Sequence, residues 1–390
     1  MVKFVDTPPT APQRTGEENE LSSKLSPQDV DQIAEIFHTP LNGAYTWDYV
    51  EADKKLRKLY ALGKERNWNA DSDVDWSRPV DRTQSAMLSD AENPYAGWEP
   101  FEALSPEEQT EFSWHSACWT TSQFLHGEQG ALLVASQLVS CAPTYEGKLY
   151  AASQTFDEAR HVEVFTRYLR QNLGFMYPVN RHLKSLLDKI LTDERWDLKF
   201  IGMQLIIESL ALAAFNVQKV TTSDALLRDV LELVLRDEAR HVAFGVTYME
   251  QFVKTLSEQE ILDRANFAFE ACRVMRERIV PSDVFEHYGM DVDEGRKRFL
   301  AAGQLDTFRN LLFARIMPNL NKVGLLPEAV HAKYDELGLM QFAGLAHDGD
   351  IDWADLSRPL PVYAESERAA PKQSGIFSAT KGSSRDAANG

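Results

Sequence analysis

The hydrophobic pattern of the chain predicts helices, and a strand pattern persists nowhere. Between residues 45 and 66, Leu56, Leu59 and Tyr60 recur at the three- and four-residue spacing that places side chains on one side of a helix. We therefore predict an all-α protein with a helix that begins at Pro27. The further predicted helical segments span residues 45–66, 106–141, 145–172, 181–192, 194–220, 224–256, 258–280, 292–316 and 327–338.

Two breaks in this pattern predict helical hairpins. Pro143 cannot continue a helix, so the helices on either side of it should run antiparallel. The polar run from Thr221 to Asp224 is typical of a second turn and a helix cap. A longer link, with residues 181–192 as a short crossover helix, must then join the first hairpin to the second.

One six-residue string occurs twice in the chain. Residues Asp157 to Val162 read Asp-Glu-Ala-Arg-His-Val, and the same string returns 80 residues later, from Asp237 to Val242. Outside this string only isolated positions match, so the chain is not an array of structural repeats.

Two further glutamates share the offset of 80 residues. Glu128 precedes Glu158 by 30 residues, and Glu208 precedes Glu238 by 30. Both glutamates of a hairpin are roughly 22 Å from its turn, at 1.5 Å per residue, so they should lie at one level. Each string also carries a histidine three residues after its glutamate, on the same helix face. The full set is Glu128, Glu158, His161, Glu208, Glu238 and His241.

This set predicts a site for two metal ions inside a four-helix bundle. Four glutamates balance two divalent cations, whereas buried carboxylates without a cation would be very costly. Glu208 interrupts the apolar run from Leu205 to Phe215, where a lone charge has no favourable partner. Oxygen-rich ligands with one imidazole per metal suit iron or manganese better than zinc. We predict two iron ions, with an iron–manganese pair as the alternative.

Charged residues inside the repeated string should support the ligands. Asp157 and Asp237 are candidates to accept the second N–H of the ligand histidines and so to fix their orientation. Arg160 and Arg240 should pair with these aspartates in a network between helices, and the alternative is that both are simple surface charges.

Four other residues near the ligands are expected to have structural roles. His126 is two positions from Glu128 and faces away from it, so an outer hydrogen bond is its expected role. His115 is expected to pack in the core. Tyr168 and Tyr248 are expected to be buried with satisfied hydroxyls, and electron relay is the alternative.

At the doubled Asp-Glu-Ala-Arg-His string the chain resembles the ferritin-like diiron-carboxylate superfamily. It is most similar to the oxygen-activating branch, such as the hydroxylase large subunits of bacterial multicomponent monooxygenases, over residues 119–256. The resemblance implies a ferritin-like four-helix bundle with additional flanking helices. One iron would be bound by Glu128, Glu158 and His161. The other would be bound by Glu208, Glu238 and His241, with Glu158 and Glu238 bridging.

The chain departs from three branches of this superfamily at single positions. Phe165 stands where small subunits of ribonucleotide reductase usually carry a radical tyrosine. Val234 stands where arylamine N-oxygenases carry a seventh ligand, a histidine. Leu212 stands where multicomponent hydroxylases usually carry a threonine.

Composition and charge limit the partners and the compartment. The formal net charge of −18 argues against nucleic acid and anionic membrane surfaces as partners. No run reaches the length of about 18 uncharged apolar residues that spans a membrane. The three cysteines are unclustered, and the N-terminus has no apolar signal segment, so we predict a cytoplasmic protein.

The chain is predicted to be organised around the bundle. The predicted parts are a disordered segment (1–26), a helical N-terminal extension (27–118), the dimetal bundle (119–256), a C-terminal helical extension packed on the bundle (257–355) and a flexible tail (356–390).

The leading hypothesis is an O2-dependent oxidoreductase of the monooxygenase or hydroxylase type, acting on a hydrophobic or aromatic small molecule. A first alternative is an N-oxygenase or desaturase-type oxidase. A second is an iron-handling ferroxidase or a metal-stabilised structural subunit. Electrons must come from an external reductase or ferredoxin, because no Gly-rich nucleotide-binding motif stands on a strand. Glu208 is the predicted catalytic carboxylate, which shifts during turnover, and the sequence leaves open whether the chain forms a homodimer.

Overall fold

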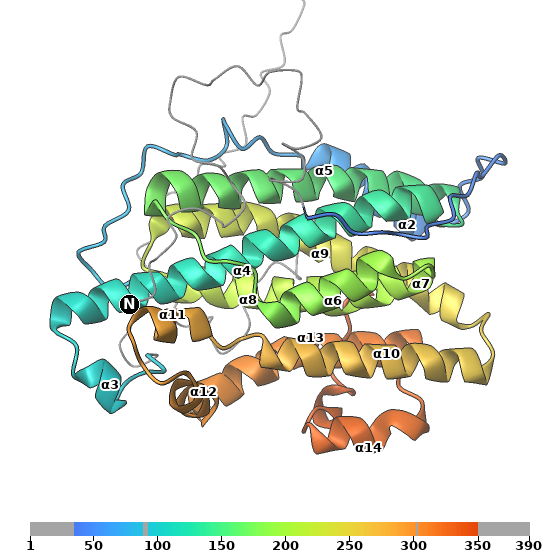
Figure 1. Cartoon of the computed structure of the whole chain (residues 1–390). Helices are drawn as coiled ribbons and strands as arrows, with labels where there is room; N and C mark the ends of the chain where they lie inside the picture. Colours follow the sequence, from blue (N-terminus) through green and yellow to red (C-terminus); the bar gives the residue numbers. More distant parts are fainter. Residues whose placement is uncertain (1–34, 89–92, 302, 350–390) are drawn as a thin grey trace, which may run out of the picture.

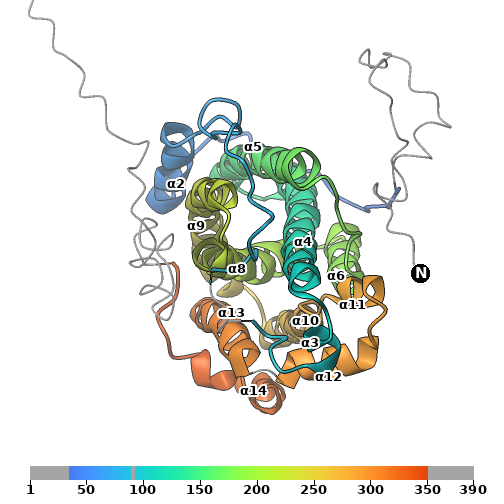
Figure 2. The same ribbon diagram turned by 90° about the vertical axis from the view of Figure 1, so that its left-hand side faces the viewer.

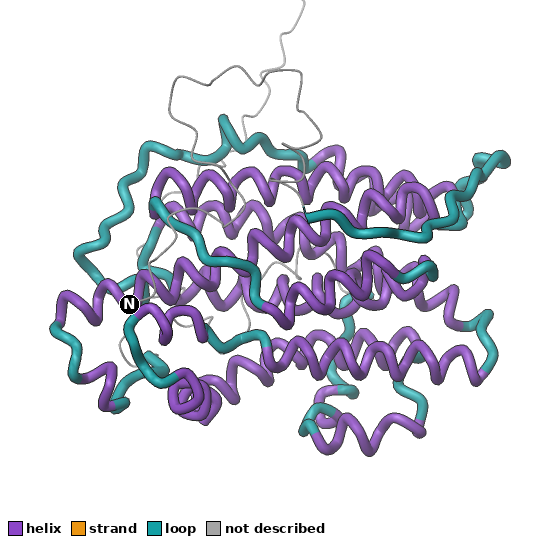
Figure 3. The backbone as a smooth tube through the Cα atoms, viewed as in Figure 1, coloured by secondary structure: helices purple, strands orange, loops and turns teal. Residues whose placement is uncertain are grey.

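The computed structural model describes residues 35–88, 93–301 and 303–349, and in these ranges all regular elements are helices (Figures 1 and 3). The β-type contact within them is an isolated bridge between Met87 and Thr222. The prediction of an all-α protein is therefore confirmed.

Four long rods form the bundle that Figure 2 shows end-on. They are α4 (Pro106–Cys141), α5 (Tyr145–Arg167), the rod that ends in α8 (Glu208–Thr221), and α9 (Ala225–Val253). Helix α4 packs along α5, α8 packs along α9, and α5 also contacts α9. The two predicted hairpins are thus present and lie against each other.

Side-chain caps fix where three of the bundle helices begin, and two of these caps follow the hairpin turns. Helix α4 starts with a capping box, in which Ser105 and Glu108 satisfy each other's backbone N–H groups. Thr144 caps α5 by accepting from the backbone of Gly147, and Asp224 caps α9 by accepting from that of Leu226. Both turns fall where the sequence predicted them.

The third rod contains an unusual helical stretch. It runs from α7 (Trp196–Lys199) through the π-helix η3 (Phe200–Ile207) into α8. The N–H of Glu208 is bonded to the carbonyl of Met203, five residues back, instead of to the fourth residue back. A second π-helix, η2 (Tyr168–Leu173), ends the α5 rod. The sequence predicted the rods but not these changes of pitch.

The third rod is also the one described helix that is long and apolar enough to cross a membrane, from Trp196 to Thr221. Its mean hydropathy is 1.7, and 94% of the window lies buried inside the protein, as is typical of a core helix. The sequence analysis required about 18 apolar residues without a charge. This helix did not meet that criterion, because it contains Glu208.

Shorter helices surround the bundle. Helix α2 (Lys54–Glu65) packs on α5 and α9, and α6 (Arg181–Thr192) crosses over between α4 and α10 (Glu258–Glu277). Helix α13 (Gly303–Val323) lies against α8 and α9. The remaining elements are α3 (Glu99–Glu102), α11 (Ser282–His287), α12 (Val292–Ala301), α14 (Glu328–Glu336) and the 3-10 turn η4 (Met340–Phe342).

Some predicted boundaries need correction. The helix predicted for residues 45–66 is only α2, because the residues from 45 to 53 have no regular secondary structure and Asp53 accepts from two backbone N–H groups as the N-cap. Helices α12 and α13 cover the described part of the segment predicted as helix for 292–316, and α13 continues beyond it to Val323. The segment 1–26 and the tail 356–390 fall outside the described residues. The start of the helix predicted at Pro27 also falls outside them, and the described residues that follow, 35–53, contain no helix. The domain boundaries at 119 and 256 stay a prediction.

Candidate metal centre

The six residues of the repeated set converge in the middle of the bundle, one or two from each rod. All are buried, with at most 4% of any residue exposed. They form two groups in which possible ligand atoms all lie within 4.8 Å of one another. The first group is Glu128, Glu158, His161 and Glu238, and the second is Glu158, Glu208, Glu238 and His241.

The two histidines turn the same ring nitrogen toward the carboxylates. Nδ1 of His161 lies 2.9 Å from Glu128 and 3.1 Å from Glu238. Nδ1 of His241 lies 3.2 Å from Glu158 and 3.5 Å from Glu238. Glu158 and Glu238 belong to both groups, which is the position of ligands that bridge two ions. Glu128 and Glu208 each belong to one group.

The other nitrogen of each histidine faces an aspartate of the opposite hairpin. His161 Nε2 lies 3.2 Å from Asp237, and His241 Nε2 lies 3.2 Å from Asp157. Each aspartate can accept a hydrogen bond from Nε2, so that Nδ1 is the nitrogen that faces the glutamates and could bind a cation. The predicted role of the aspartates is confirmed, and the pairing is crossed between the hairpins.

The predicted arginine network is also present and fully buried. Arg160 donates to both Asp157 and Asp237, and its distance to Asp237 is 3.0 Å. Arg240 donates to the same two aspartates, to Asp157 at 2.9 Å and to Asp237 at 2.5 Å. Trp68, on the loop after α2, donates from Nε1 to Asp237 at 2.8 Å and lies under the Arg160 guanidinium. The alternative of surface charges is excluded, since Arg160 and Arg240 are at most 4% exposed.

Two glutamine side chains add an amide chain on the other side of the glutamates. Gln154 donates from Nε2 to Glu158 at 3.0 Å and to Glu208 at 3.1 Å. Gln204, within η3, donates to the Gln154 oxygen at 3.1 Å. The sequence analysis missed Gln154, although its position one helical turn before Glu158 indicated that it could contact this ligand. It also missed Trp68, which no spacing rule connects to the site.

The four residues set aside from the site all have other partners. His126 bonds the carbonyl of Tyr177 at 2.9 Å, as expected of an outer residue. His115 is buried beside the Tyr177 hydroxyl at 2.8 Å. The Tyr168 hydroxyl donates to Asp224, and that of Tyr248 bonds Thr144 at 3.0 Å. These structural roles are confirmed.

The donor set fits two divalent cations. Both carboxylate oxygens of Glu238, one of Glu158 and the Nδ1 atom of His241 are buried without a hydrogen-bond partner in the described structure. Burial, together with the neighbouring Glu238 carboxylate, raises the pKa of Glu128 and of Glu208 well above the ordinary range. Four carboxylates in one dry volume therefore resist joint ionisation, and cations between them would remove that conflict.

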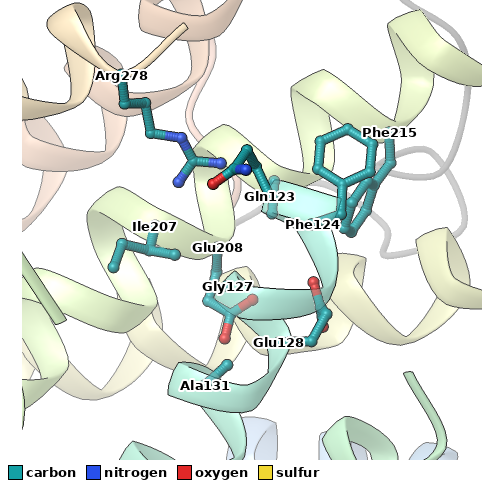
Figure 4. A pocket seen from close by; sticks show the side chains of 10 residues that line it. Gln123, Phe124, Gly127, Glu128, Ala131, Ile207, Glu208, Phe215 and Arg278 are labelled. Atoms are coloured by element: carbon teal, nitrogen blue, oxygen red, sulfur yellow. The ribbon is translucent and has the colours of Figure 1, made fainter. Parts of the chain in front are cut away.

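A small pocket opens beside this centre (Figure 4). Glu128 and Glu208 line it, and the rest of its wall is mostly apolar, with Arg278 as a third charged residue. In this conformation it has room for about one water molecule. Its lining residues are Gln123, Phe124, Gly127, Glu128, Ala131, Ile207, Glu208, Ala211, Phe215 and Arg278.

The fold and this centre together define a ferritin-like protein of the dimetal-carboxylate class. The sequence adds a narrower assignment, because residues 50–324, well over half of the chain, match the family model of P-aminobenzoate N-oxygenase AurF. The chain belongs to this family. It is an oxygenase-type enzyme, and that class was the one predicted from the sequence. The family match is closer to the N-oxygenase alternative than to the hydroxylase reading.

The other comparisons are weaker. Two solved variants of an R2-like ligand-binding oxidase, anaerobically reconstituted with a Mn/Fe cofactor, are 18% and 19% identical to the chain, with TM-scores of 0.42 and 0.43. Each alignment covers 71% of this chain and 94% of the other. Such TM-scores are too low to support a conclusion about function. No curated protein matches the sequence.

Proposed function

We propose that the chain is a non-haem dimetal oxygenase that uses O2 to oxidise a small aromatic amine at nitrogen. The observation that carries the proposal is the pair of buried ligand groups that share Glu158 and Glu238 beside a mostly apolar pocket. Two iron ions, or an iron–manganese pair, would be held by the six predicted ligands and would supply the binding and activation of O2.

The side chains of the protein would orient these ligands. Asp237 and Asp157 accept from Nε2 of the two histidines, which keeps Nδ1 unprotonated and aimed at the centre. The Arg160 and Arg240 guanidiniums in turn hold the aspartates in place. Because this layer is buried, it excludes water from its own side of the centre.

We propose that Glu208 is the carboxylate that changes position during turnover. It lines the pocket, it belongs to only one ligand group, and it begins the α-helix directly after η3. A π-helix satisfies backbone bonds in a looser pitch, and such stretches are frequent at functional sites. Gln154 would stabilise the carboxylate by its 3.1 Å hydrogen bond.

Hydroxylation of an aromatic or hydrophobic compound is the second candidate. Val234, at the position where arylamine N-oxygenases carry a seventh ligand, is buried and offers no donor atom. A centre with six protein ligands has a different donor set from that of such enzymes, and this favours keeping the hydroxylase reading open. In either case an external reductase or ferredoxin would supply electrons, and we place the chain in the cytoplasm.

The test is to load the full chain anaerobically with ferrous iron, count the metal, and add O2 with 4-aminobenzoate or 4-ethylaniline. We expect about two ions per chain and an oxidised amine detected by mass spectrometry. Glu208→Ala should lose the product and part of the metal. Glu163→Ala, which removes an exposed glutamate from α5 close to His161, is the matched control and should retain both. Full oxidation by Glu208→Ala would sink the proposal.

A further inference from the structure

A buried polar network connects the start of α8 to the last part of the described chain. Ser209, the residue after Glu208, accepts a hydrogen bond from Nδ2 of Asn319 at 3.1 Å. Asn319 belongs to α13, which lies beside α8 and outside the four rods of the bundle (Figure 2). Its other hydrogen bonds lead to Asp348, which follows η4. The network therefore reaches the candidate centre from outside the bundle.

Asp348 holds the side-chain amide of Asn319 in one orientation. Nδ2 of Asn319 donates to Oδ2 of Asp348 at 2.8 Å, and Oδ1 of Asn319 accepts from the backbone N–H of Asp348 at 2.9 Å. Oδ1 of Asp348 is in turn paired with Arg315 at 2.9 Å. The amide nitrogen thus faces two acceptors and the amide oxygen faces a donor, so a flipped amide would lose these bonds.

This network is removed from water. Ser209 and Asn319 are 0% exposed, and Asp348 is 2% exposed. Burying polar and charged groups is unfavourable, and apolar side chains in their place would pack without that cost. Directional hydrogen bonds, unlike apolar contacts, fix one position of α13 relative to α8.

The segment that carries Asp348 is also seated on α9, the helix that supplies Glu238 and His241. A Cβ on Gly349 would lie 2.6 Å from Cγ1 of Val246, so a larger residue here would have to displace this contact. Val246 lies five residues after His241 on the same helix. The position of Asp348 is therefore set by the bundle as well as by α13.

Glu208 stands where the third rod changes pitch. The π-helix η3 ends at Ile207, and the N–H of Glu208 bonds the carbonyl of Met203, five residues back. Because π- and α-helical bonds have different spacing, this ladder alone leaves the rotation of the helix at Glu208 open to small changes. Ser209 lies about 100° further around the helix and contacts α13, while Glu208 faces the centre. A hold on Ser209 therefore also fixes the direction of Glu208.

We propose that Asn319, oriented by Asp348, is a positioning residue that fixes the rotation of α8 and so keeps the Glu208 carboxylate within reach of its metal ion. This inference rests on the proposed function, in which Glu208 is a ligand that changes position. The hydrogen bond to Ser209 holds the helix, so the change is confined to the side chain of Glu208. The segment Ala343–Gly349 is then part of the support of the centre.

The test measures metal binding in the absence of O2. The metal-free full chain is titrated anaerobically with ferrous iron in competition with a chelator, which gives the affinities of the two ions. Asn319→Ala should weaken the binding of one ion by roughly tenfold and leave the other within about threefold of the native chain, because Glu128 and His161 are untouched. Asp348→Ala should have the same selective effect, because the amide of Asn319 is then no longer held in one orientation.

A double-mutant cycle shows whether the effect passes through Ser209. Ser209→Ala removes only the acceptor hydroxyl, and we expect it to weaken the binding of one ion as Asn319→Ala does. In the double variant the loss of affinity should be no larger than in either single variant, because both changes break the same hydrogen bond. Two independent structural losses would instead add. If Asn319→Ala does not fold, Ser209→Ala carries the same test.

Two other asparagines provide matched controls. Asn321 is exposed on α13 and bonds the carbonyl of Ala343. Asn216 is buried in α8 and donates to the carbonyl of Leu212 in its own helix. Asn321→Ala and Asn216→Ala should both keep the affinities of the two ions within about threefold, since neither bond belongs to the network. Asn216→Ala should still lower the melting temperature, which separates a loss of stability from a loss of metal affinity.

The proposal is overturned if folded Asn319→Ala binds both ions as the native chain does, if it weakens both ions equally, or if the losses in the double variant add. Failure of the proposed function has a different signature. If Asn319→Ala weakens one ion selectively but the native chain forms no oxidised amine with O2, the oxygenase assignment is contradicted and the positioning role is supported. If the native chain oxidises the amine and Asn319→Ala has unchanged metal affinities, the oxygenase assignment is supported and the positioning role is contradicted.

Discussion

The Nε2 atom of His161 lies 3.2 Å from Oδ2 of Asp237, a residue of the opposite hairpin. The relationship is reciprocal, since Nε2 of His241 lies 3.2 Å from Asp157. Each repeated string therefore supplies a glutamate and a histidine to the centre and an aspartate that orients the histidine of the other string. Neither hairpin can assemble its half of the centre alone.

Replacing Asp237 should weaken the centre by misdirecting His161. In Asp237→Asn the partner is neutral, Nε2 is no longer held by a charge, and Arg160 and Arg240 each lose an ion pair. We expect metal affinity to fall by roughly 10- to 100-fold, as for other residues that support metal ligands. Competition with a chelator measures this affinity. Asp157→Asn should lower the metal affinity to a similar extent. Asp263→Asn, which replaces a half-exposed aspartate, is the control and should leave the metal affinity unchanged. Unchanged affinity in both buried variants would refute the crossed arrangement.

Trp68 should matter for stability through its indole N–H, because its acceptor is a buried carboxylate. Trp68→Phe removes the 2.8 Å bond to Asp237, and we expect a loss of about 1.5–3 kcal/mol in the free energy of unfolding. Trp76→Phe is the matched control, since Trp76 donates to the neutral carbonyl of Ala70 at 2.7 Å and should cost only about 0.5–1.5 kcal/mol. Urea unfolding of both variants compares the two losses. Equal losses would mean that the charge of Asp237 adds nothing.

Gly245 allows η3 to approach α9 closely. A Cβ at this position would lie 2.5 Å from Cβ of Gln204 and 3.3 Å from its backbone carbon, which cannot yield as a flexible side chain can. Gly245→Ala should therefore destabilise the chain by about 1–3 kcal/mol and displace the π-helix before Glu208. In Gly127→Ala, by contrast, the new methyl meets nothing within 4 Å, and helix propensity should add up to about 1 kcal/mol of stability. In thermal unfolding, the melting temperature of Gly245→Ala should be lower than that of the native chain, and that of Gly127→Ala should be higher.

Local sequence signals determined much of the fold in advance. Pro143 and the Thr221–Asp224 run marked the hairpin turns, and the helices around them lie close to their predicted limits. The centre followed because two equal spacings on antiparallel rods must bring the glutamates to one level. These inferences need only the rise of a helix and the direction of its side chains, both of which are properties of the backbone.

The contacts that the sequence did not reveal depend on tertiary packing. Trp68 and Arg278 come from segments outside the bundle, and their positions depend on how α2 and α10 pack, which no periodicity encodes. The π-helix before Glu208 could not be predicted either, because Phe200–Ile207 is apolar apart from Gln204 and carries no signal of pitch. The irregular stretch before α2 was mistaken for helix because its apolar side chains continue the helical spacing.

His115 should make stability depend on pH between 6.5 and 5.5. Burial lowers its pKa to about 3, and the nearby charges of His287 and Arg82 add to this effect. The unfolded chain binds a proton at this histidine below about pH 6.5, whereas the folded chain does not, so the free energy of unfolding falls as the pH falls through this window. The contribution of one such group over this unit of pH is about 1 kcal/mol.

His115→Gln keeps a polar partner for Tyr177 and removes the titrating group. Between pH 6.5 and 5.5 its free energy of unfolding should fall by about 1 kcal/mol less than that of the native chain, as measured by urea unfolding at the two pH values. The exposed His38→Gln variant controls for removal of a histidine as such and should follow the native chain. If His115→Gln has the same pH dependence as the native chain, His115 is not held neutral in the fold.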